Sequence, residues 1–275
     1  MVMSQSSHRQ EMQSHYWNKA LEASSHRNFS DAIYFFKLFL KTTPHSAKGH
    51  YYLGIAYHSN RNLNAAIECY NKSLSIDKNQ PNVYCDRGVA LAELGMKSDA
   101  LKSYARAIKL YPEYAEAYYN KGISLLATGA YVEAIDAFNH AHRLKPDLLM
   151  AELNIGVALT ELGQYQDALK LYEYLIKKAP NFAPGFYNYA NVLSKINQFT
   201  EALQQYDKAL VMKSDYAEAF YNRGNTLVAL KRYDEALKSY DKAISIIPDY
   251  AEAFYNKGNT LVNLKRFKEA LQSYE

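Results

Sequence analysis

Three observations on the sequence predict an all-α fold, a solenoid of antiparallel helix pairs. A 34-residue unit recurs in register from Gln13 to the end of the chain, with no insertion or deletion between copies. Small residues and aromatic rings recur at fixed positions in each unit, as two packed helices require. Several units end in proline, which cannot continue a helix. Because such a repeat contacts only its neighbours, we expect an elongated helical body with a continuous core.

Residues 1–12 form a polar N-terminal tail in this scheme, and residues 13–275 form the solenoid. The tail has neither the apolar segment nor the cleavage pattern of a signal peptide, and Lys37 interrupts the strongest apolar stretch, residues 32–40. We therefore expect a cytoplasmic protein with no membrane partner. The eight repeats, the last of them truncated, begin at Gln13, Ala47, Pro81, Ala115, Leu149, Ala183, Ala217 and Ala251.

The first helix expected in each repeat carries a small residue at its eighth position. The residues at this position are Gly54, Gly88, Gly122, Gly156, Gly224 and Gly258, with Ala20 and Ala190 in the other two repeats. A residue without a bulky side chain lets another helix approach closely. This position therefore predicts the closest contact between the two helices of a repeat.

The second helix expected in each repeat carries alanine at the twentieth position and a ring four residues later, one turn along the same face. The alanines are Ala32, Ala66, Ala100, Ala134, Ala168, Ala202, Ala236 and Ala270. The rings are Phe36, Tyr70, Tyr104, Phe138, Tyr172, Tyr206, Tyr240 and Tyr274. Small residue and ring together predict a packed seam. Proline then ends five repeats, at Pro44, Pro112, Pro146, Pro180 and Pro248.

This pattern resembles the tetratricopeptide repeat family over nearly all of the chain after the first dozen residues. The resemblance implies a right-handed superhelix with a concave groove lined by the first helix of each repeat. It also implies that the second, fifth, sixth, ninth, twelfth and thirteenth positions face that groove. The first repeat departs from the family pattern, because Trp17 stands one position later than the usual tryptophan and Tyr16 takes its place.

Composition and motifs argue against several other classes of function. The net charge of +4 is mild and lacks the basic stripe or recognisable motif of a dedicated nucleic-acid-binding protein. Cys69 and Cys85 lie in adjacent repeats without metal-ligand spacing, so we expect neither a disulfide framework nor a metal site. No phosphate loop, nucleophile elbow or HExxH motif is present. We therefore expect no catalytic residue, no enzyme activity in this chain and no cofactor.

The groove-facing columns contain the candidate site. The sixth position holds an unbroken row of asparagines in five repeats, namely Asn120, Asn154, Asn188, Asn222 and Asn256. The ninth position adds Asn191, Asn225 and Asn259, and the fifth position adds Tyr119, Tyr187, Tyr221 and Tyr255. An asparagine amide offers a donor and an acceptor, so it can bind a peptide backbone whatever its side chains. If the first helices of neighbouring repeats lie about 8–10 Å apart and an extended peptide rises about 3.3 Å per residue, the row of five asparagines would hold a segment of roughly fifteen residues.

The same residues also have a purely structural interpretation. Asparagine is common at the sixth position of this family and can bond to a neighbouring helix or to water, and tyrosines at helical spacing often pack within the core. Both interpretations stay open on the sequence alone. The favoured function is a non-enzymatic scaffold that binds a protein or an extended peptide segment in the groove.

Two subtypes of the family offer further comparisons. Receptors for acidic chaperone tails carry a lysine in the fifth column, and this chain has none there. The asparagine row instead resembles the repeat region of the O-linked N-acetylglucosamine transferases and their bacterial relatives. The alternative function is therefore the N-terminal substrate-recognition region of a larger glycosyltransferase. The last repeat stops within its second helix at Glu275, which favours a longer parent protein.

The first repeat is unusually rich in aromatic residues, with Trp17, Tyr34, Phe35 and Phe36. Such a cluster suits either a cap for the solenoid or a contact surface. Self-association through the N-terminal repeats is accordingly included among the expected partners.

Overall fold

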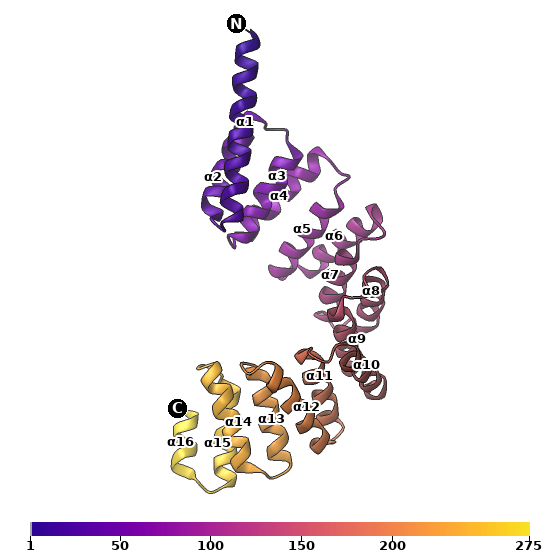
Figure 1. The fold of residues 1–275 in the computed structure, drawn as a ribbon, viewed down its shortest axis with the longest axis vertical. Helices are drawn as coiled ribbons and strands as arrows, with labels where there is room; N and C mark the ends of the chain where they lie inside the picture. The colour runs from indigo at the N-terminus through magenta and orange to yellow at the C-terminus, as the bar shows by residue number, and fades with distance from the viewer. Residues whose placement is uncertain (1) are drawn as a thin grey trace. The chain divides into compact units, whose positions relative to one another are not determined.

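The computed structural model describes residues 2–275, with side chains from His8 onward, and within this range it contains sixteen α-helices and no strand. The chain divides into two compact units, called here unit 1 (Met1–Asp147) and unit 2 (Leu148–Glu275). Each unit consists of four antiparallel helix pairs (Figure 1). The prediction of an all-α helical-repeat fold is confirmed.

Helix boundaries follow the 34-residue period. Unit 1 contains α1 (Val2–Ser25), α2 (Phe29–Thr42), α3 (Ala47–Ser59), α4 (Leu63–Ile76), α5 (Pro81–Glu93), α6 (Lys97–Leu110), α7 (Ala115–Leu126) and α8 (Tyr131–Leu144). Unit 2 contains α9 (Leu149–Glu161), α10 (Tyr165–Lys178), α11 (Ala183–Lys195), α12 (Phe199–Met212), α13 (Ala217–Ala229), α14 (Tyr233–Ile246), α15 (Ala251–Asn263) and α16 (Phe267–Tyr274). Odd-numbered helices are called A helices and even-numbered ones B helices.

The residues predicted to form a polar tail belong to a helix. Met1 lies outside the described residues, and from Val2 onward the chain runs in α1 without a break into the first repeat. A guanidinium nitrogen of Arg9 donates a 2.6 Å hydrogen bond to the carbonyl of Thr42, at the end of α2. This bond ties the N-terminal extension of α1 to its partner helix.

The predicted seam between A and B helices is confirmed. The alanine at the twentieth position of every repeat is at most 2 % exposed. A Cβ atom added at Gly122 would lie 2.6 Å from the ring of Phe138, and one at Gly224 would lie 2.6 Å from the ring of Tyr240. Real side chains do not approach so closely, so glycine at the eighth position makes room for the ring sixteen residues later.

The turn between the A and B helices has one residue with left-handed backbone angles in every repeat. Three of these residues are glycines, Gly95, Gly129 and Gly163, and the other five are Arg27, Arg61, Asn197, Lys231 and Lys265, with φ between 58° and 78° over the whole set. A left-handed residue lets the backbone satisfy the last carbonyls of the A helix. In the third repeat, for example, Gly95 N donates to Ala92 O at 2.9 Å.

Successive A helices also touch one another within each unit. In unit 1, α3 contacts α5 and α5 contacts α7, and in unit 2 the same holds from α9 to α15. The A helices therefore form one side of each unit, and their side chains meet between repeats. Over residues 2–275, no helix combines the length and the apolar character that a membrane span needs.

Candidate functional site

Side chains of the sixth position reach back to the preceding repeat and contact the residue 35 positions earlier. Asn222 donates from Nδ2 to the hydroxyl of Tyr187 at 3.0 Å. One repeat later, Asn256 donates from Nδ2 to the hydroxyl of Tyr221 at the same distance. We call these contacts between the fifth and sixth positions of successive repeats the cross-repeat bonds.

The ninth position joins this arrangement. The second N–H of Asn222 points to Oδ1 of Asn191 at 3.0 Å, and the buried hydroxyl of Tyr206 donates to the same oxygen at 2.6 Å. Both amide hydrogens of Asn222 and both acceptor sites of Asn191 are thus used within the protein. These bonds lock the two amides in opposite orientations.

The following repeat contains the same network, shifted by 34 residues. Asn256 donates to Oδ1 of Asn225 at 2.9 Å, and Tyr240 donates to that oxygen at 2.8 Å. Farther along, the hydroxyl of Tyr274 donates to Oδ1 of Asn259 at 2.7 Å. The last three repeats of unit 2 therefore share one polar pair, made of Asn at the ninth position and Tyr at the twenty-fourth.

The other asparagines of the row differ from this pattern. Asn188 follows a repeat with Leu153 at the fifth position, which has no hydroxyl, and its Nδ2 donates instead to the carbonyl of Pro184 at 2.9 Å. Asn120, in unit 1, keeps the 35-residue offset to the fifth position, but its acceptor is the sulfur of Cys85 at 3.7 Å. Asn154 is only 9 % exposed. The five asparagines predicted to act alike thus lie in different environments.

The tyrosines of the fifth position are partly packed. The ring of Tyr187 lies 4.8 Å from that of Tyr216, and the ring of Tyr221 lies 5.1 Å from that of Tyr250, between ring centroids. Burial raises the pKa of Tyr187, although the nearby amide of Asn191 and the hydrogen bond from Asn222 oppose the shift. The hydroxyl is therefore neutral and able to accept the cross-repeat bond.

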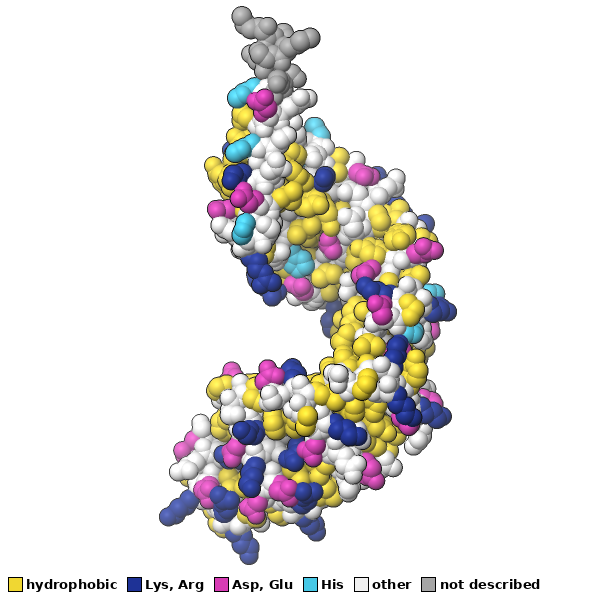
Figure 2. Space-filling model, in the orientation of Figure 1, with side chains coloured by type: hydrophobic (Ala, Val, Ile, Leu, Met, Phe, Trp, Pro, Cys, Tyr) yellow, Lys and Arg dark blue, Asp and Glu magenta, His cyan; other side chains and the backbone are white. Residues whose placement is uncertain are grey.

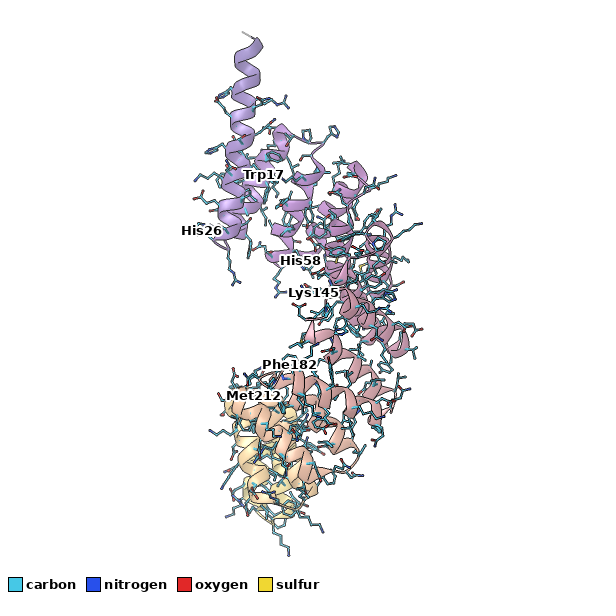
Figure 3. The ribbon with its side chains drawn as sticks, turned by 45° about the vertical axis from the view of Figure 1, so that its right-hand side comes forward. Trp17, His26, His58, Lys145, Phe182 and Met212 are labelled. Carbon is cyan, nitrogen blue, oxygen red and sulfur yellow. The ribbon has the colours of Figure 1, made fainter. Side chains whose placement is uncertain are left out.

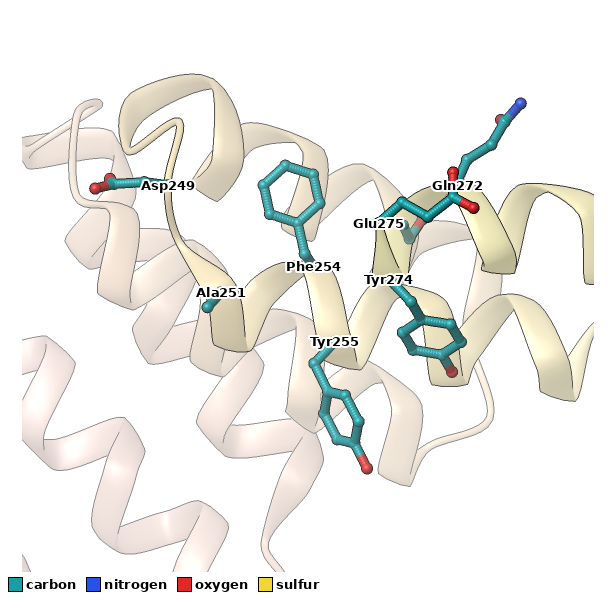
Figure 4. Close-up of a pocket in the computed structure, with 8 residues that line it drawn as sticks. Asp249, Ala251, Phe254, Tyr255, Gln272, Tyr274 and Glu275 are labelled. Atoms are coloured by element: carbon teal, nitrogen blue, oxygen red, sulfur yellow. The ribbon is translucent and has the colours of Figure 1, made fainter.

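Two other tyrosines of the column differ from this pattern. Tyr119 in unit 1 packs at 5.7 Å against Phe138. Tyr255 is 61 % exposed and lies 6.0 Å from Tyr274 of the neighbouring helix (Figure 4). Together with Asp249 and Phe254 these two rings border a hollow of about 370 Å³.

A hollow of about 330 Å³ lies over the polar network of unit 2. Its lining comes largely from groove-facing positions of two successive A helices, and consists of Asn191, Ser194, Lys195, Phe199, Tyr206, Asn222, Asn225 and Thr226. The structure thus brings together the predicted Asn191, Asn222 and Asn225. Lys195 forms an ion pair with Glu161 at 3.2 Å, so its charge is already partly compensated.

The corresponding positions of unit 1 form a more apolar hollow of about 290 Å³. Val89 and Ile123 occupy the ninth positions that hold asparagine in unit 2, and Asn120 lies beside them. The two units therefore present different chemistry from equivalent positions.

Sequence reasoning missed two polar pairs. Tyr51 donates to the half-buried carboxylate of Asp86 at 2.8 Å, which is a cross-repeat bond of reversed direction. Lys178 pairs at 3.1 Å with the carboxylate of Glu152, which is 5 % exposed. The 35-residue offset between the fifth and sixth columns could have revealed the first pair.

The cysteines are free thiols, and burial raises the pKa of each to about 11. Both are thus protonated and unreactive at neutral pH. Across the described part of the chain, no group of three or more His, Cys, Asp or Glu residues is arranged to hold a metal ion.

Comparison with protein families gives consistent matches along the chain. A model described as TPR repeat matches residues 62–95, 190–231 and 224–265. Three models described as tetratricopeptide repeat match residues 85–148, 150–181 and 171–204. Together the matched segments cover well over half of the sequence. No match was found among curated proteins.

Solved structures give matching folds. A tetratricopeptide repeat protein from Parabacteroides merdae is similar with a TM-score of 0.76 over 91 % of this chain and 99 % of its own, at 18 % identity, which speaks for the fold alone. MamA is 28 % identical over 61 % of this chain and 92 % of its own, with a TM-score of 0.58. YrrB, described as a TPR protein with an unusual peptide-binding site, is 27 % identical over 70 % of this chain and 98 % of its own, with a TM-score of 0.51.

Proposed function

Because this chain belongs to the tetratricopeptide repeat family, which includes protein-interaction scaffolds, we propose that unit 2 binds extended peptide segments along its A helices. The ligand contacts are Asn191, Asn222, Asn225 and Asn256, with Asn259 and Tyr255 extending the surface. Asn154 is too buried to contribute to this set, and Asn188 contributes less because its amide is turned to its own helix.

The observation that supports this proposal is the opposite orientation of neighbouring amides. Internal bonds use the N–H groups of Asn222 and the carbonyl of Asn191, so Asn222 offers an acceptor to a ligand and Asn191 offers donors. Asn256 and Asn225 repeat this arrangement one repeat later. A peptide backbone presents one donor and one acceptor per residue, which complements such an alternation.

The internal network also favours binding energetically. Each hydrogen bond to a ligand contributes only about 0.5–1.5 kcal/mol, so several must act together. Side chains already fixed by the cross-repeat bonds lose little conformational entropy on binding. The structural and ligand-binding interpretations of the asparagines are therefore complementary, since the first prepares the second. YrrB, a similar repeat protein that is described as having a peptide-binding site, adds support.

A variant that removes only the N–H groups of Asn191 and Asn225, and keeps the oxygens used in the internal bonds, tests the proposal. In Asn191→Asp with Asn225→Asp, each side chain keeps an oxygen for the internal bonds but loses the N–H donors. We expect this double variant to keep its helical circular dichroism and to lose most binding to an array of unstructured peptides of about fifteen residues.

The matched control is Tyr206→Phe with Tyr240→Phe, which removes internal bonds and leaves the free N–H groups in place. We expect the control to bind the same peptides with at most a small loss. Peptide binding that survives in the aspartate variant would assign the ligand to another surface. Equal losses in both variants would show that the asparagines act only through stability.

The proposed scaffold has no catalytic chemistry of its own, no cofactor and no nucleic-acid partner. Acidic and basic side chains are interspersed on the face of unit 2 seen in Figure 2, which suits protein partners better than a polyanion. A glycosyltransferase relationship and self-association through repeat one have no specific structural support, and both stay predictions.

A further inference from the structure

The first two repeats carry a charge imbalance that the other repeats lack. From residue 32 to residue 67 the chain contains no aspartate or glutamate, whereas it contains Lys37, Lys41, Lys48 and Arg61. Three histidines, His45, His50 and His58, lie in the same stretch. Histidine side chains are visible at several places on unit 1 in Figure 2. Arg61 and His58 pair with Glu93, so the excess positive charge of this stretch rests on its three lysines.

A hollow of about 370 Å³ lies within this region. Its lining comes from α1, from α2 and from the first turn of α3, and consists of Gln13, Ser14, Trp17, Asn18, Phe39 and Lys48. We call it the N-terminal hollow. It combines one cation, two aromatic rings, two amides and a hydroxyl, which is a different chemistry from the amide network of unit 2.

The aromatic wall of the hollow is held rigidly. Trp17 projects from α1 toward α3 (Figure 3), and its ring lies 5.0 Å from that of Phe39 and 5.1 Å from that of Tyr52. The Trp17 ring also contacts the buried ring of Phe36, with 5.5 Å between the ring centroids. A ligand would therefore meet an ordered apolar surface.

The cation of the hollow lies against two aromatic rings, and it forms no ion pair with any side chain that the structure describes. The Lys48 Nζ atom lies 4.8 Å from the centroid of the Trp17 ring and 5.9 Å from that of Tyr52. Among the described residues, none of the ion pairs includes Lys48. The nearest acidic residues in sequence are Asp31 and Glu68. Lys48 is thus an exposed, uncompensated charge beside an apolar wall.

The hollow occupies the groove-facing columns at the point where the asparagine row is interrupted. Trp17 stands at the fifth position and Tyr52 at the sixth, where unit 2 has tyrosine and asparagine. Lys48 stands at the second position of its repeat, so the arrangement differs from the fifth-position lysine of chaperone-tail receptors. Equivalent repeat positions thus hold neutral amides in unit 2 and a cation with aromatic rings in unit 1.

We propose that the N-terminal hollow binds an acidic segment of a partner protein in which a carboxylate lies next to an apolar side chain. The carboxylate pairs with Lys48, and the apolar side chain packs against Trp17 and Phe39. The amides of Gln13 and Asn18 lie where they can bond the segment's backbone. This site is independent of the proposed function, because it lies in the other unit and uses other residues.

The intrinsic fluorescence of this chain reports directly on the site, because Trp17 is its single tryptophan. The probe is an acetylated and amidated peptide in which aspartate alternates with leucine and phenylalanine. The comparison peptide has asparagine in place of every aspartate. We expect the acidic peptide to shift the emission saturably, with weaker binding at higher salt, and the neutral peptide to bind roughly tenfold more weakly or not at all.

Two variants make the test specific. Lys48→Gln should weaken binding of the acidic peptide about tenfold or more. Lys41→Gln makes the same charge change at an exposed position of α2 and should leave the affinity for this peptide within about twofold. The aspartate variant at Asn191 and Asn225 should leave the emission shift unchanged, so the two proposals fail separately.

Three results would overturn the inference. One is equal binding of the acidic and neutral peptides, and another is equal affinity of the two lysine variants. The third is tighter, Lys48-dependent binding of a single-stranded oligouridylate than of the acidic peptide, which would make the site a nucleic-acid contact.

Discussion

The hydroxyl of Tyr51 donates a 2.8 Å hydrogen bond to the carboxylate of Asp86, in the opposite direction to the asparagine-to-tyrosine bonds of unit 2. The geometry is the same in both units, since the two residues stand 35 positions apart in each case. Donor and acceptor have exchanged positions, because a carboxylate has no hydrogen to donate. One contact between A helices therefore accommodates two chemistries.

Replacing Asp86 by asparagine should stabilise unit 1 at neutral pH. Burial raises the pKa of Asp86, although the bond from Tyr51 opposes this, so the folded state binds its proton more tightly than the unfolded state. The stability linked to that proton is present below the ordinary pKa near 3.8 and is lost as the pH rises through the higher folded value. The melting temperature of Asp86→Asn should exceed that of the wild type at pH 7, and the gain should shrink as the pH falls toward 4.

The control for this prediction is Asp136→Asn, an exposed position on α8. We expect no pH-dependent difference there. A pH-independent effect of Asp86→Asn would show that packing and not ionisation sets the cost of this carboxylate.

Two buried tyrosines at the twenty-fourth position should respond differently to the loss of their hydroxyl. The hydroxyl of Tyr240 donates to Asn225 at 2.8 Å, whereas within the described structure the buried hydroxyl of Tyr70 has no partner, since Ile55 stands where unit 2 has asparagine. Tyr240→Phe should cost about 1 kcal/mol, and Tyr70→Phe should be neutral or stabilising. Urea denaturation of both variants checks this. Equal losses of stability in the two variants would contradict the assigned hydrogen bonds of Tyr240 and Tyr70.

The buried ion pair of unit 2 should be replaceable by an apolar pair. Glu152 and Lys178 stand where the seventh repeat has Phe220 and Ile246. Glu152→Phe or Lys178→Ile alone should destabilise the protein by about 3 kcal/mol, because each removes one member of an ion pair whose carboxylate is buried. The double variant should recover most of that loss or exceed the wild type. A double-mutant cycle measured by denaturation gives the coupling free energy between the two residues. If the two single effects simply add in the double variant, this prediction is wrong.

The left-handed turn residues should favour glycine. Lys231 has φ of 58°, which costs a side-chain-bearing residue about 1 kcal/mol, while Gly129 has φ of 78° with no atom near its absent Cβ. Lys231→Gly should therefore stabilise by a few tenths of a kcal/mol up to about 1 kcal/mol, and Gly129→Ala should destabilise by about 1 kcal/mol.

A glycine of the same repeat provides the comparison. Gly122→Ala places a Cβ 2.6 Å from the ring of Phe138, so it should cost more than Gly129→Ala. Thermal melts of the three variants rank these effects. A larger loss at Gly129 than at Gly122 would show that the turn, and not the seam, is the more constrained feature.

The sequence by itself determined the fold and the residues that are buried in each repeat. Size and polarity at fixed positions of a 34-residue period predict which residues are buried, because each repeat packs in the same way on its neighbour. The burial of Ala134 and Phe138 and the close approach at Gly122 agree with that pattern. The same period placed Asn191, Asn222 and Asn225 around what proves to be one hollow.

Only the tertiary structure decided which atoms of those residues form internal hydrogen bonds and which do not. The direction of a hydrogen bond depends on the partner 31 or 35 residues away, so Asn222 and Asn188 differ although they share a column. The left-handed turn at Lys231 and the approach of Lys48 to Trp17 likewise depend on contacts and backbone angles that residue type does not specify. A repeated sequence position defines where a side chain begins, and its neighbours in space decide what it can bind.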